Sequence, residues 1–239
     1  MQLSIIIPCY NEEKNIPHIL AKLKALLRGK NHSECEVLLV INGSTDNSGK
    51  VLADELRNID ENIRAVTVSK NQGYGYGILY GLEKAKGEYL CWTHADLQTD
   101  PADTFKALDI ILTNEKKPLL VKGYRSNRKL SEAFFSWCMA LISSIFLGKR
   151  LTEINAQPKL FHRSLYEQIK NKAPFDFSLD LYFLFQAKLK GIIIDFPVFF
   201  LPRLYGEAKG GSGSSLKVRI KLIKRTLKYI FELKTKLKQ

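Results

Sequence analysis

Three short, almost continuously apolar segments near the N-terminus constrain the fold more than any other feature of the sequence. They cover residues 3–8, 36–41 and 63–68 and are rich in β-branched side chains. Such runs are typical of strands buried on both faces of a parallel sheet. Helical periodicity follows each of them, at residues 12–27, 47–56 and 73–85. Strands that alternate with helices predict right-handed βαβ units, and therefore a doubly wound, Rossmann-like α/β sheet.

A fourth apolar run, residues 87–92, leads into the segment with the strongest chemical signal. Asp96 follows the carboxyl end of this predicted strand, where open α/β sheets place their ligands. Asp100 and Pro101 then form a helix-start signal. One carboxylate together with substrate phosphates is a common way to hold Mg²⁺ or Mn²⁺. Asp96 is therefore a candidate metal ligand, and the alternative is a surface carboxylate in an ordinary loop.

Charge and composition narrow the classes of partner. The 239 residues carry a formal net charge of +13, which favours a partner with phosphate groups or an anionic membrane surface. The four cysteines are far apart and show no CxxC spacing, so free thiols are expected and a zinc or disulfide framework is not. No apolar stretch reaches the roughly 18 residues that span a bilayer, and the N-terminal run is too short for a signal peptide. A soluble or peripheral protein is expected.

The glycine-rich segment at residues 71–77 does not complete a dinucleotide-binding fingerprint. Ile78 stands where the third glycine of GxGxxG would fall. Gly73 instead opens a predicted helix, and two interpretations stay open. The backbone there either approaches a phosphate or sugar, or packs tightly against another segment.

The second half of the chain is less regular. A strand at residues 118–123 ends in a basic segment with Arg125, which indicates either phosphate contacts or a solvated loop. Residues 134–147 are strongly apolar and predict either a buried helix or an interfacial helix that guides a lipid acceptor. Residues 192–200 read as a pair of short strands broken by Pro197.

The C-terminal region predicts a loop and a basic helix beyond one domain at residues 1–209. Residues 210–215 are rich in Gly and Ser and predict a flexible loop over the site. Residues 216–239 predict a basic amphipathic helix, with nine Lys or Arg against one Glu up to residue 238. Since no aromatic-interleaved nucleic-acid motif accompanies it, an anionic membrane surface is the preferred partner and nucleic acid is not.

Four motifs occur in order over the first hundred residues: IIPCYNEE at residues 6–13, NGSTD at 42–46, NQGYG at 71–75 and ADLQTDP at 95–101. Together they resemble the family 2 glycosyltransferases of GT-A fold, and especially the dolichol-phosphate mannosyltransferase-like branch. A looser match, RLYGEAK at residues 203–209, is similar to the RxxGxSK segment of that branch.

The resemblance implies a nucleotide-sugar donor, Mg²⁺ or Mn²⁺, and a set of site residues. Asp96 would coordinate the metal that bridges the donor diphosphate, and Glu12 would lie near the ribose or base. The predicted nucleotide-sugar pocket comprises Pro8, Tyr10, Glu12, Asn42, Asp46, Gly73, Ala95, Asp96 and Gln98. The predicted acceptor or phosphate contacts are Arg125, Arg203 and Lys209.

Two positions depart from the family pattern. Asn42 stands where the family usually has a carboxylate before Gly-Ser, so base recognition would rely on an amide. His94 replaces the first Asp of the DxD element. An imidazole is a softer ligand than a carboxylate, so His94 is either a metal ligand or an ordinary loop histidine.

Asp180 best matches the acidic residue that faces the acceptor in this family, with Asp176 as its rival. The reaction implied is an inverting, metal-assisted sugar transfer to a polyprenyl phosphate at the cytoplasmic membrane face. One alternative is transfer to a hydroxyl of a glycan or glycolipid, with Asp180 as general base. A second is a non-catalytic nucleotide-sugar-binding protein. A homo-oligomer is left open.

Overall fold

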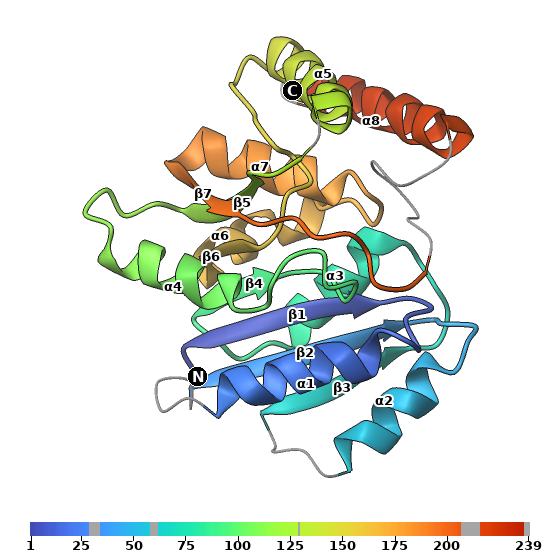
Figure 1. The fold of residues 1–239 in the computed structure, drawn as a ribbon. Helices are drawn as coiled ribbons and strands as arrows, with labels where there is room; N and C mark the ends of the chain where they lie inside the picture. Colours follow the sequence, from blue (N-terminus) through green and yellow to red (C-terminus); the bar gives the residue numbers. More distant parts are fainter. Residues whose placement is uncertain (29–33, 58–61, 129, 207–215, 237–239) are drawn as a thin grey trace.

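The fold was taken from a computed structural model of the 239-residue chain (Figure 1). The structure describes residues 1–28, 34–57, 62–128, 130–206 and 216–236. Lys209 and the predicted loop at residues 210–215 lie outside these ranges.

A seven-stranded sheet in the order β3-β2-β1-β4-β6-β5-β7 forms the centre of the molecule. All neighbouring pairs are parallel except those of β6, which runs antiparallel to both β4 and β5. The strands are β1 (Leu3–Cys9), β2 (Cys35–Asn42), β3 (Ile63–Val68), β4 (Tyr89–Trp92), β5 (Leu120–Arg125), β6 (Lys159–His162) and β7 (Ile193–Val198). The predicted mostly parallel α/β sheet is thus confirmed.

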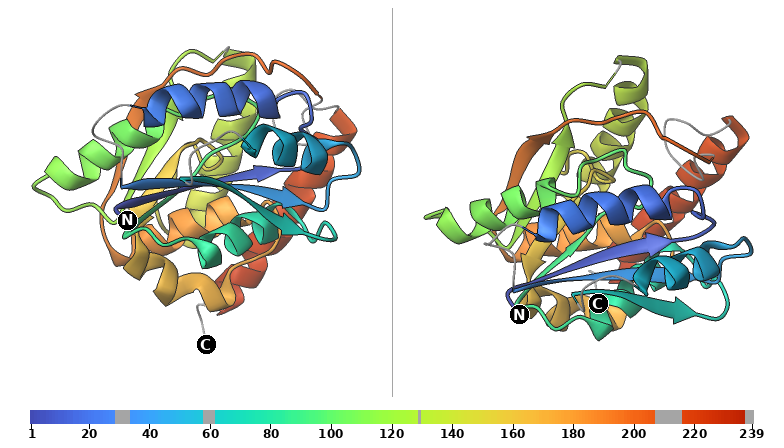
Figure 2. Two further views of the ribbon diagram at one scale, coloured as in Figure 1. Left: turned by 90° about the horizontal axis from the view of Figure 1, so that it is seen from below. Right: turned by 60° about the horizontal axis from the view of Figure 1, so that its bottom comes forward.

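Helices cover both faces of the sheet (Figure 2). They are α1 (Ile16–Leu27), α2 (Ser48–Leu56), α3 (Tyr74–Lys84), α4 (Asp103–Thr113), α5 (Leu130–Leu147), α6 (Arg163–Ile169), the 3₁₀ turn η1 (Lys170–Lys172), α7 (Leu179–Lys190) and α8 (Leu216–Lys236). Successive strand residues supply opposite faces: Ile6 packs with α3 and α7, whereas Ile5 and Ile7 pack with α1 and α4. Two hydrophobic cores result, and Cys9, Cys35 and Cys91 are buried in the structure as free thiols.

Three details differ from the sequence-based expectation. Strand β6 was not predicted, because it includes Lys159 and directly follows Pro158. The first helix begins at Ile16 and not at residue 12, because the intervening residues belong to a hydrogen-bonded loop. Strand β7 runs through Pro197 without a break. Because β7 is an edge strand, the missing N–H of proline can face away from the ladder.

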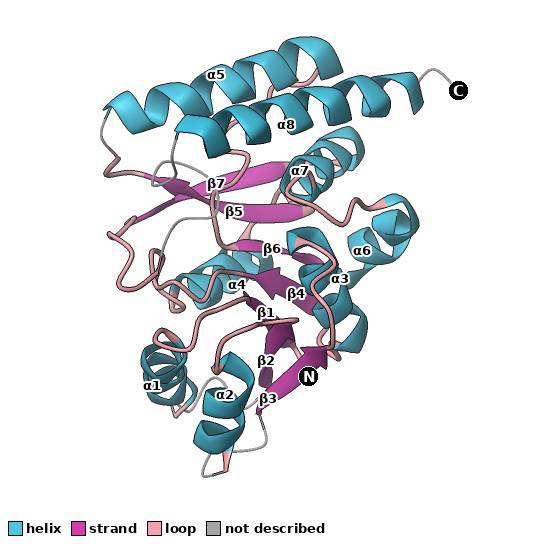
Figure 3. Cartoon of the chain, turned by 90° about the vertical axis from the view of Figure 1, so that its right-hand side faces the viewer, coloured by secondary structure: helices cyan, strands magenta, loops and turns pink. Residues whose placement is uncertain are grey.

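Helices α5 and α8 lie side by side beyond the β7 edge of the sheet (Figure 3). The rings of Phe146 and Phe231 meet edge to face with centroids 5.1 Å apart. Ile230 and Leu233 of α8 are buried in the core, so this part of the predicted apolar stripe packs on the domain itself. Within the described ranges, no helix is both long and apolar enough to cross a membrane.

Candidate active site

The loops that follow β1 and β2 are bound to each other at the carboxyl edge of the sheet. Asn11, in the left-handed region at φ +57°, accepts a hydrogen bond from the Thr45 N–H at 2.8 Å. Asp46 accepts from the N–H of Glu13 at 3.2 Å and from the N–H of Ser48 at 3.0 Å. The two loops therefore form one preorganised platform beside the strand ends.

The Asp46 carboxylate serves this platform as an anion. Burial raises its pKa, but hydrogen bonds from the Ser48 hydroxyl and N–H and from the Glu13 N–H outweigh burial, so the pKa lies below its usual value. Pro8, in β1, and Tyr10, directly after it, are half-buried. Whether these residues contact a nucleotide stays a prediction.

Asn42 is the last residue of β2 and is buried against the start of α3. Its Nδ2 donates to the Gly73 carbonyl at 2.9 Å. Its Oδ1 is buried and accepts no hydrogen bond from any described residue. A buried acceptor of this kind is unusual in a native fold and calls for a donor from outside the described residues.

The glycine-rich start of α3 is in close contact with the segment that precedes α7. A Cβ on Gly73, at φ +113°, would lie 2.4 Å from the Phe175 carbonyl oxygen, and one on Gly75 would lie 2.5 Å from that of Pro174. The Tyr76 N–H donates to the same Phe175 oxygen at 3.0 Å. Tight packing of this segment is therefore observed, whereas an approach of the Gly73 backbone to a phosphate or sugar stays a prediction.

Asp96 lies four residues beyond the end of β4 and is only 3% exposed. Its Oδ1 accepts from the Gln98 N–H at 3.2 Å, and its Oδ2 accepts from Arg203 Nη2 at 2.7 Å. Arg203 Nη1 also lies 3.5 Å from Glu12 Oε1. Asp96 and Glu12, the two carboxylates predicted to bind the donor, therefore lie beside the same cation. That cation is Arg203, which the sequence predicts as a phosphate contact.

The segment after β7 runs over the strand ends as a strap, residues 199–206. The Leu201 N–H donates to the Gln98 carbonyl at 2.8 Å, and Gln98 Nε2 donates back to the Leu201 carbonyl at 3.2 Å. The Tyr205 carbonyl accepts from Asn15 at 3.3 Å, and the Tyr205 ring stacks on His18. These contacts hold Arg203 over Asp96.

His94 lies on the other side of Asp96 and contacts Tyr74. The His94 Nε2 is 3.2 Å from the Tyr74 hydroxyl. Burial lowers the His94 pKa, and the nearby Asp96 and Asp180 offset this only in part, so the ring is neutral at pH 7. A neutral imidazole can bind a metal, but this role of His94 stays a prediction.

A buried polar network extends from Tyr74 into the core. Gln157 Nε2 lies 3.4 Å from the Tyr74 hydroxyl and donates to Asp180 Oδ1 at 3.0 Å. The same Asp180 oxygen pairs with Lys159 Nζ, which also donates to the Ala156 carbonyl at 2.8 Å. Lys159 is 0% exposed and Asp180 2%. Burial lowers the pKa of Lys159, and Asp180 opposes that shift.

Sequence reasoning missed this network. The only available signal was a lysine inside an otherwise apolar run, Lys159-Leu160-Phe161, because a charge in such a run needs a partner. Nothing in the sequence indicates that the partner is Asp180.

Arg125 lies at the end of β5 and is already paired. Its Nε donates to Glu153 Oε2 at 2.7 Å, and Arg128 Nη2 lies 3.1 Å from the other Glu153 oxygen. Burial raises the pKa of Glu153, but Arg125 and then Arg128 outweigh it and hold that pKa below its usual value. An acceptor phosphate would therefore compete with Glu153 for Arg125.

A metal ion would fit beside Asp96 if the substrate supplied most of its ligands. The described residues contain no group of three or more His, Cys, Asp or Glu side chains arranged to hold a metal. However, the buried Asp96 carboxylate is already paired with the Arg203 cation, so its surroundings accept a positive charge. One carboxylate plus phosphate oxygens is a common Mg²⁺ arrangement.

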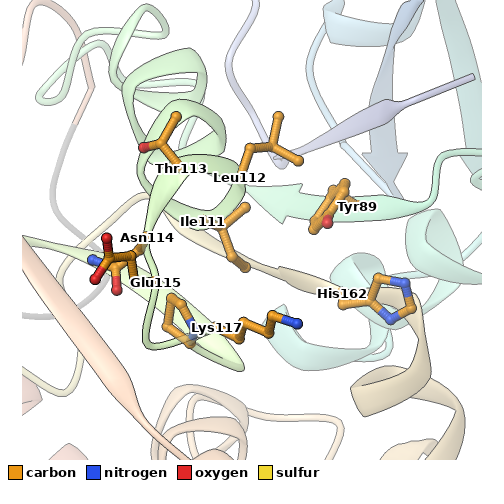
Figure 4. A pocket seen from close by; sticks show the side chains of 9 residues that line it. Tyr89, Ile111, Leu112, Thr113, Asn114, Glu115, Lys117 and His162 are labelled. Carbon is orange, nitrogen blue, oxygen red and sulfur yellow. The ribbon is translucent and has the colours of Figure 1, made fainter.

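A surface cavity lies away from these residues. It measures about 450 Å³ and is lined by Tyr89, His162 and the end of α4 (Figure 4). Tyr89 begins β4, so this cavity is at the amino end of the strand whose carboxyl end leads to Asp96. It contains none of the predicted site residues.

The chain belongs to glycosyl transferase family 2, whose model matches residues 4–177. Strands β1 to β6, apart from Leu3, and the loop that contains Asp96 lie in that range, whereas β7 and the strap with Arg203 lie beyond it. The similarity of this chain to solved glycosyltransferases extends the match to the fold. The chain superposes on glucosyl-3-phosphoglycerate synthase from Mycobacterium tuberculosis, solved with Mn²⁺ and uridine diphosphate, with a TM-score of 0.72. The two sequences are 16% identical, and the match covers 95% of this chain and 76% of the synthase.

A second solved relative is S. aureus TarS (residues 1–349) in complex with UDP-GlcNAc, at a TM-score of 0.64 with 21% identity, covering 93% of this chain and 65% of that one. Both establish the GT-A fold.

Among curated proteins, an undecaprenyl-phosphate 4-deoxy-4-formamido-L-arabinose transferase of Pseudomonas fluorescens is 31% identical over 141 residues, 59% of this chain and 40% of that protein. A dodecaprenyl-phosphate galacturonate synthase of Rhizobium johnstonii is 28% identical over 179 residues, 71% of this chain and 50% of that protein. The chain spans about half the length, or less, of these relatives.

Proposed function

We propose that this chain transfers a sugar, with inversion, from a nucleotide sugar to a polyprenyl phosphate. The observation that carries the proposal is the convergence of Asp96, Glu12 and Arg203 at the carboxyl edge of the sheet. Open α/β sheets bind ligands at this edge, and a diphosphate can be held there by a cationic side chain and by a carboxylate-bound metal.

The donor would bind between the β1 and β2 loops and Asp96. Asn42 would offer its amide to the base after a local movement that exposes the buried Oδ1. Asp96 would hold Mg²⁺ or Mn²⁺, with His94 as a second candidate ligand. When bound, the metal would offset negative charge on the leaving diphosphate. Arg203 would turn from Asp96 towards the diphosphate as the donor enters, since a guanidinium can pair with either.

The transfer requires no general base from the protein. A phosphate oxygen of the acceptor attacks the anomeric carbon, and the bond from that carbon to the donor diphosphate breaks. The bonding electron pair leaves with the nucleoside diphosphate. An acceptor phosphate is already anionic, so no proton has to be removed.

The environment of Asp180 favours a phosphate acceptor over a hydroxyl acceptor. A general base has to be free to accept a proton, whereas the Asp180 carboxylate is paired with Lys159, a cation that is itself fully buried. Asp176, the rival acid, is bound to Arg225 at 3.3 Å. The printed names of both curated relatives include a polyprenyl phosphate.

Docking at the anionic, cytoplasmic face of a membrane would bring the lipid acceptor to the site. Helix α5 exposes one apolar face, formed by Phe134, Trp137, Leu141 and Ile145. These positions recur at helical spacing and are 42–69% exposed. The neighbouring α8 exposes Lys221 and Lys224. An exposed aromatic face beside lysines matches a helix at the lipid interface.

The acceptor test compares a polyprenyl phosphate with the polyprenol of the same chain length. The purified chain is incubated with Mn²⁺ and a panel of radiolabelled UDP-sugars, because both solved relatives bind a uridine nucleotide. Transfer to the phosphate and not to the alcohol is expected. Transfer to the alcohol or to a glycan would favour the hydroxyl-acceptor reaction instead. Donor binding without transfer to any acceptor would favour a non-catalytic binding protein.

A further inference from the structure

Helix α8 contacts the segment that precedes α7 through the side chain of Arg225. Its Nε lies 3.3 Å from Asp176 Oδ2, and its guanidinium carbon lies 5.2 Å from the centre of the Phe177 ring. Asp176 and Phe177 belong to the segment that leads into α7. A helix distant in sequence is thus bound to the turn that precedes Asp180.

The same segment contacts the residues around Asp96. The rings of Phe177 and Tyr74 stack with centroids 4.7 Å apart and planes inclined by 6°. The Tyr74 hydroxyl is 3.2 Å from His94 Nε2, and His94 precedes Asp96 by two positions. A continuous set of side-chain contacts therefore connects Arg225 to the DxD-like element.

Different parts of this segment are held by different contacts. Its backbone is fixed on α3 by the Tyr76 N–H bond and by the close approach at Gly73 and Gly75. Asp176 Oδ1 accepts from the Ser178 N–H at 2.8 Å and so supports the start of α7. The Phe177 ring is 36% exposed and is contacted from outside by Arg225. Loss of Arg225 would therefore free this ring but leave the backbone in place.

We propose that Arg225 is a positioning residue, which holds Phe177 against Tyr74 and thereby fixes His94 beside Asp96. Helix α8 would then support the catalytic geometry in addition to any contact with a membrane. The inference rests on the transfer function proposed above. Because the ion pair and the ring contact are both partly exposed, they add little to folding stability, but a small displacement of reacting groups has a large effect on rate.

The kinetic test uses a short, water-soluble isoprenyl phosphate as acceptor, so that membrane docking does not enter. Arg225→Ala is expected to lower kcat about tenfold, while the KM for the nucleotide sugar stays within about twofold and the melting temperature is unchanged. Arg225→Lys keeps the charge but loses the planar contact, and is expected to fall in between. The matched control, Glu232→Ala, removes another ion pair of α8, with Lys228 at 3.9 Å, and should behave as wild type.

A spectroscopic readout requires no substrate. In protein labelled with 4-fluorophenylalanine, the Phe177 resonance is assigned by its loss in Phe177→Leu. It is expected to shift in Arg225→Ala and not in Glu232→Ala. An unchanged Phe177 resonance, or a kcat equal to that of Glu232→Ala, overturns the proposal. If the wild type transfers no sugar to any acceptor, the proposed function fails, and the ¹⁹F comparison still tests whether Arg225 holds the Phe177 ring in place.

Discussion

The guanidinium of Arg203 neutralises Asp96 and lies where a metal ion bound to that carboxylate would lie. This guanidinium lies 2.7 Å from Asp96 and 3.5 Å from Glu12, although these residues are distant in sequence. A metal ion would therefore compete with Arg203 for the same carboxylate. We expect Arg203→Ala to bind Mn²⁺ severalfold more tightly without donor, and to show a higher KM for the nucleotide sugar. Electron paramagnetic resonance titration of Mn²⁺ measures the first effect.

An exposed ion pair provides the control for Arg203. Arg57→Ala removes a pair with Asp54 on α2 and should leave Mn²⁺ binding unchanged. If Arg203→Ala and Arg57→Ala bind Mn²⁺ equally, competition at Asp96 does not occur.

The buried Lys122 predicts how the free energy of unfolding changes with pH. Its side chain is 1% exposed, and burial lowers its pKa from 10.5 to about 8, opposed by Asp195. Between these two values the unfolded chain binds a proton at Lys122 that the native state does not, so the contribution of Lys122 to stability rises with pH. Lys122→Met lacks this dependence. Its stability relative to wild type should therefore fall as the pH rises from about 8 to 10.5.

Denaturant unfolding of both proteins at several pH values measures this difference. Lys116→Met, on the exposed turn after α4, is the control and should follow the wild-type pH profile. A constant difference between Lys122→Met and wild type across this range would show that Lys122 titrates normally.

At the scale of elements, α5 and α8 form an outer layer whose two helices differ in their exposed side chains. The apolar face of α5 is exposed, whereas Ile230 and Leu233 of α8 are buried. We therefore expect membrane contact to depend on α5 for apolar insertion and on α8 for charge. Trp137→Ser with Ile145→Ser should lower the affinity for anionic vesicles, measured by co-sedimentation, at least about a hundredfold, because each inserted side chain contributes about 1.5–3 kcal/mol.

The exposed Leu112 on α4 supplies a control outside this layer, and Leu112→Ser should sediment as wild type. High salt should weaken wild-type binding, since lysines contribute to it. Equal sedimentation of all variants would mean that the α5 face binds something other than lipid. Point variants are preferable to deletion of α8, because its loss would also expose the core around Ile230.

At the scale of the whole molecule, the sequence predicts what is local and periodic. Strands β1 to β4 are recognisable because each is a short apolar run followed by a helix signal. Strand β6 is not, because its Lys159 becomes tolerable in the core only once α7 supplies Asp180. Likewise, the sequence predicts that Arg203 contacts a phosphate. Its pairing with Asp96 could not be predicted, because that pairing depends on the path of the strap in the folded chain. Tertiary partners of charged residues are what the sequence leaves undetermined.

The most direct measurement is metal-dependent transfer by Asp96→Asn. This variant keeps the size of the side chain but loses the charge that would hold the metal and the donor diphosphate. Sugar transfer to a polyprenyl phosphate is measured for wild type and variant, with Mn²⁺ and with EDTA. We predict that Asp96→Asn lowers transfer at least about a hundredfold while the circular dichroism spectrum is retained, and that EDTA abolishes wild-type transfer. Undiminished transfer in the variant or in EDTA would contradict a metal-assisted reaction centred on Asp96.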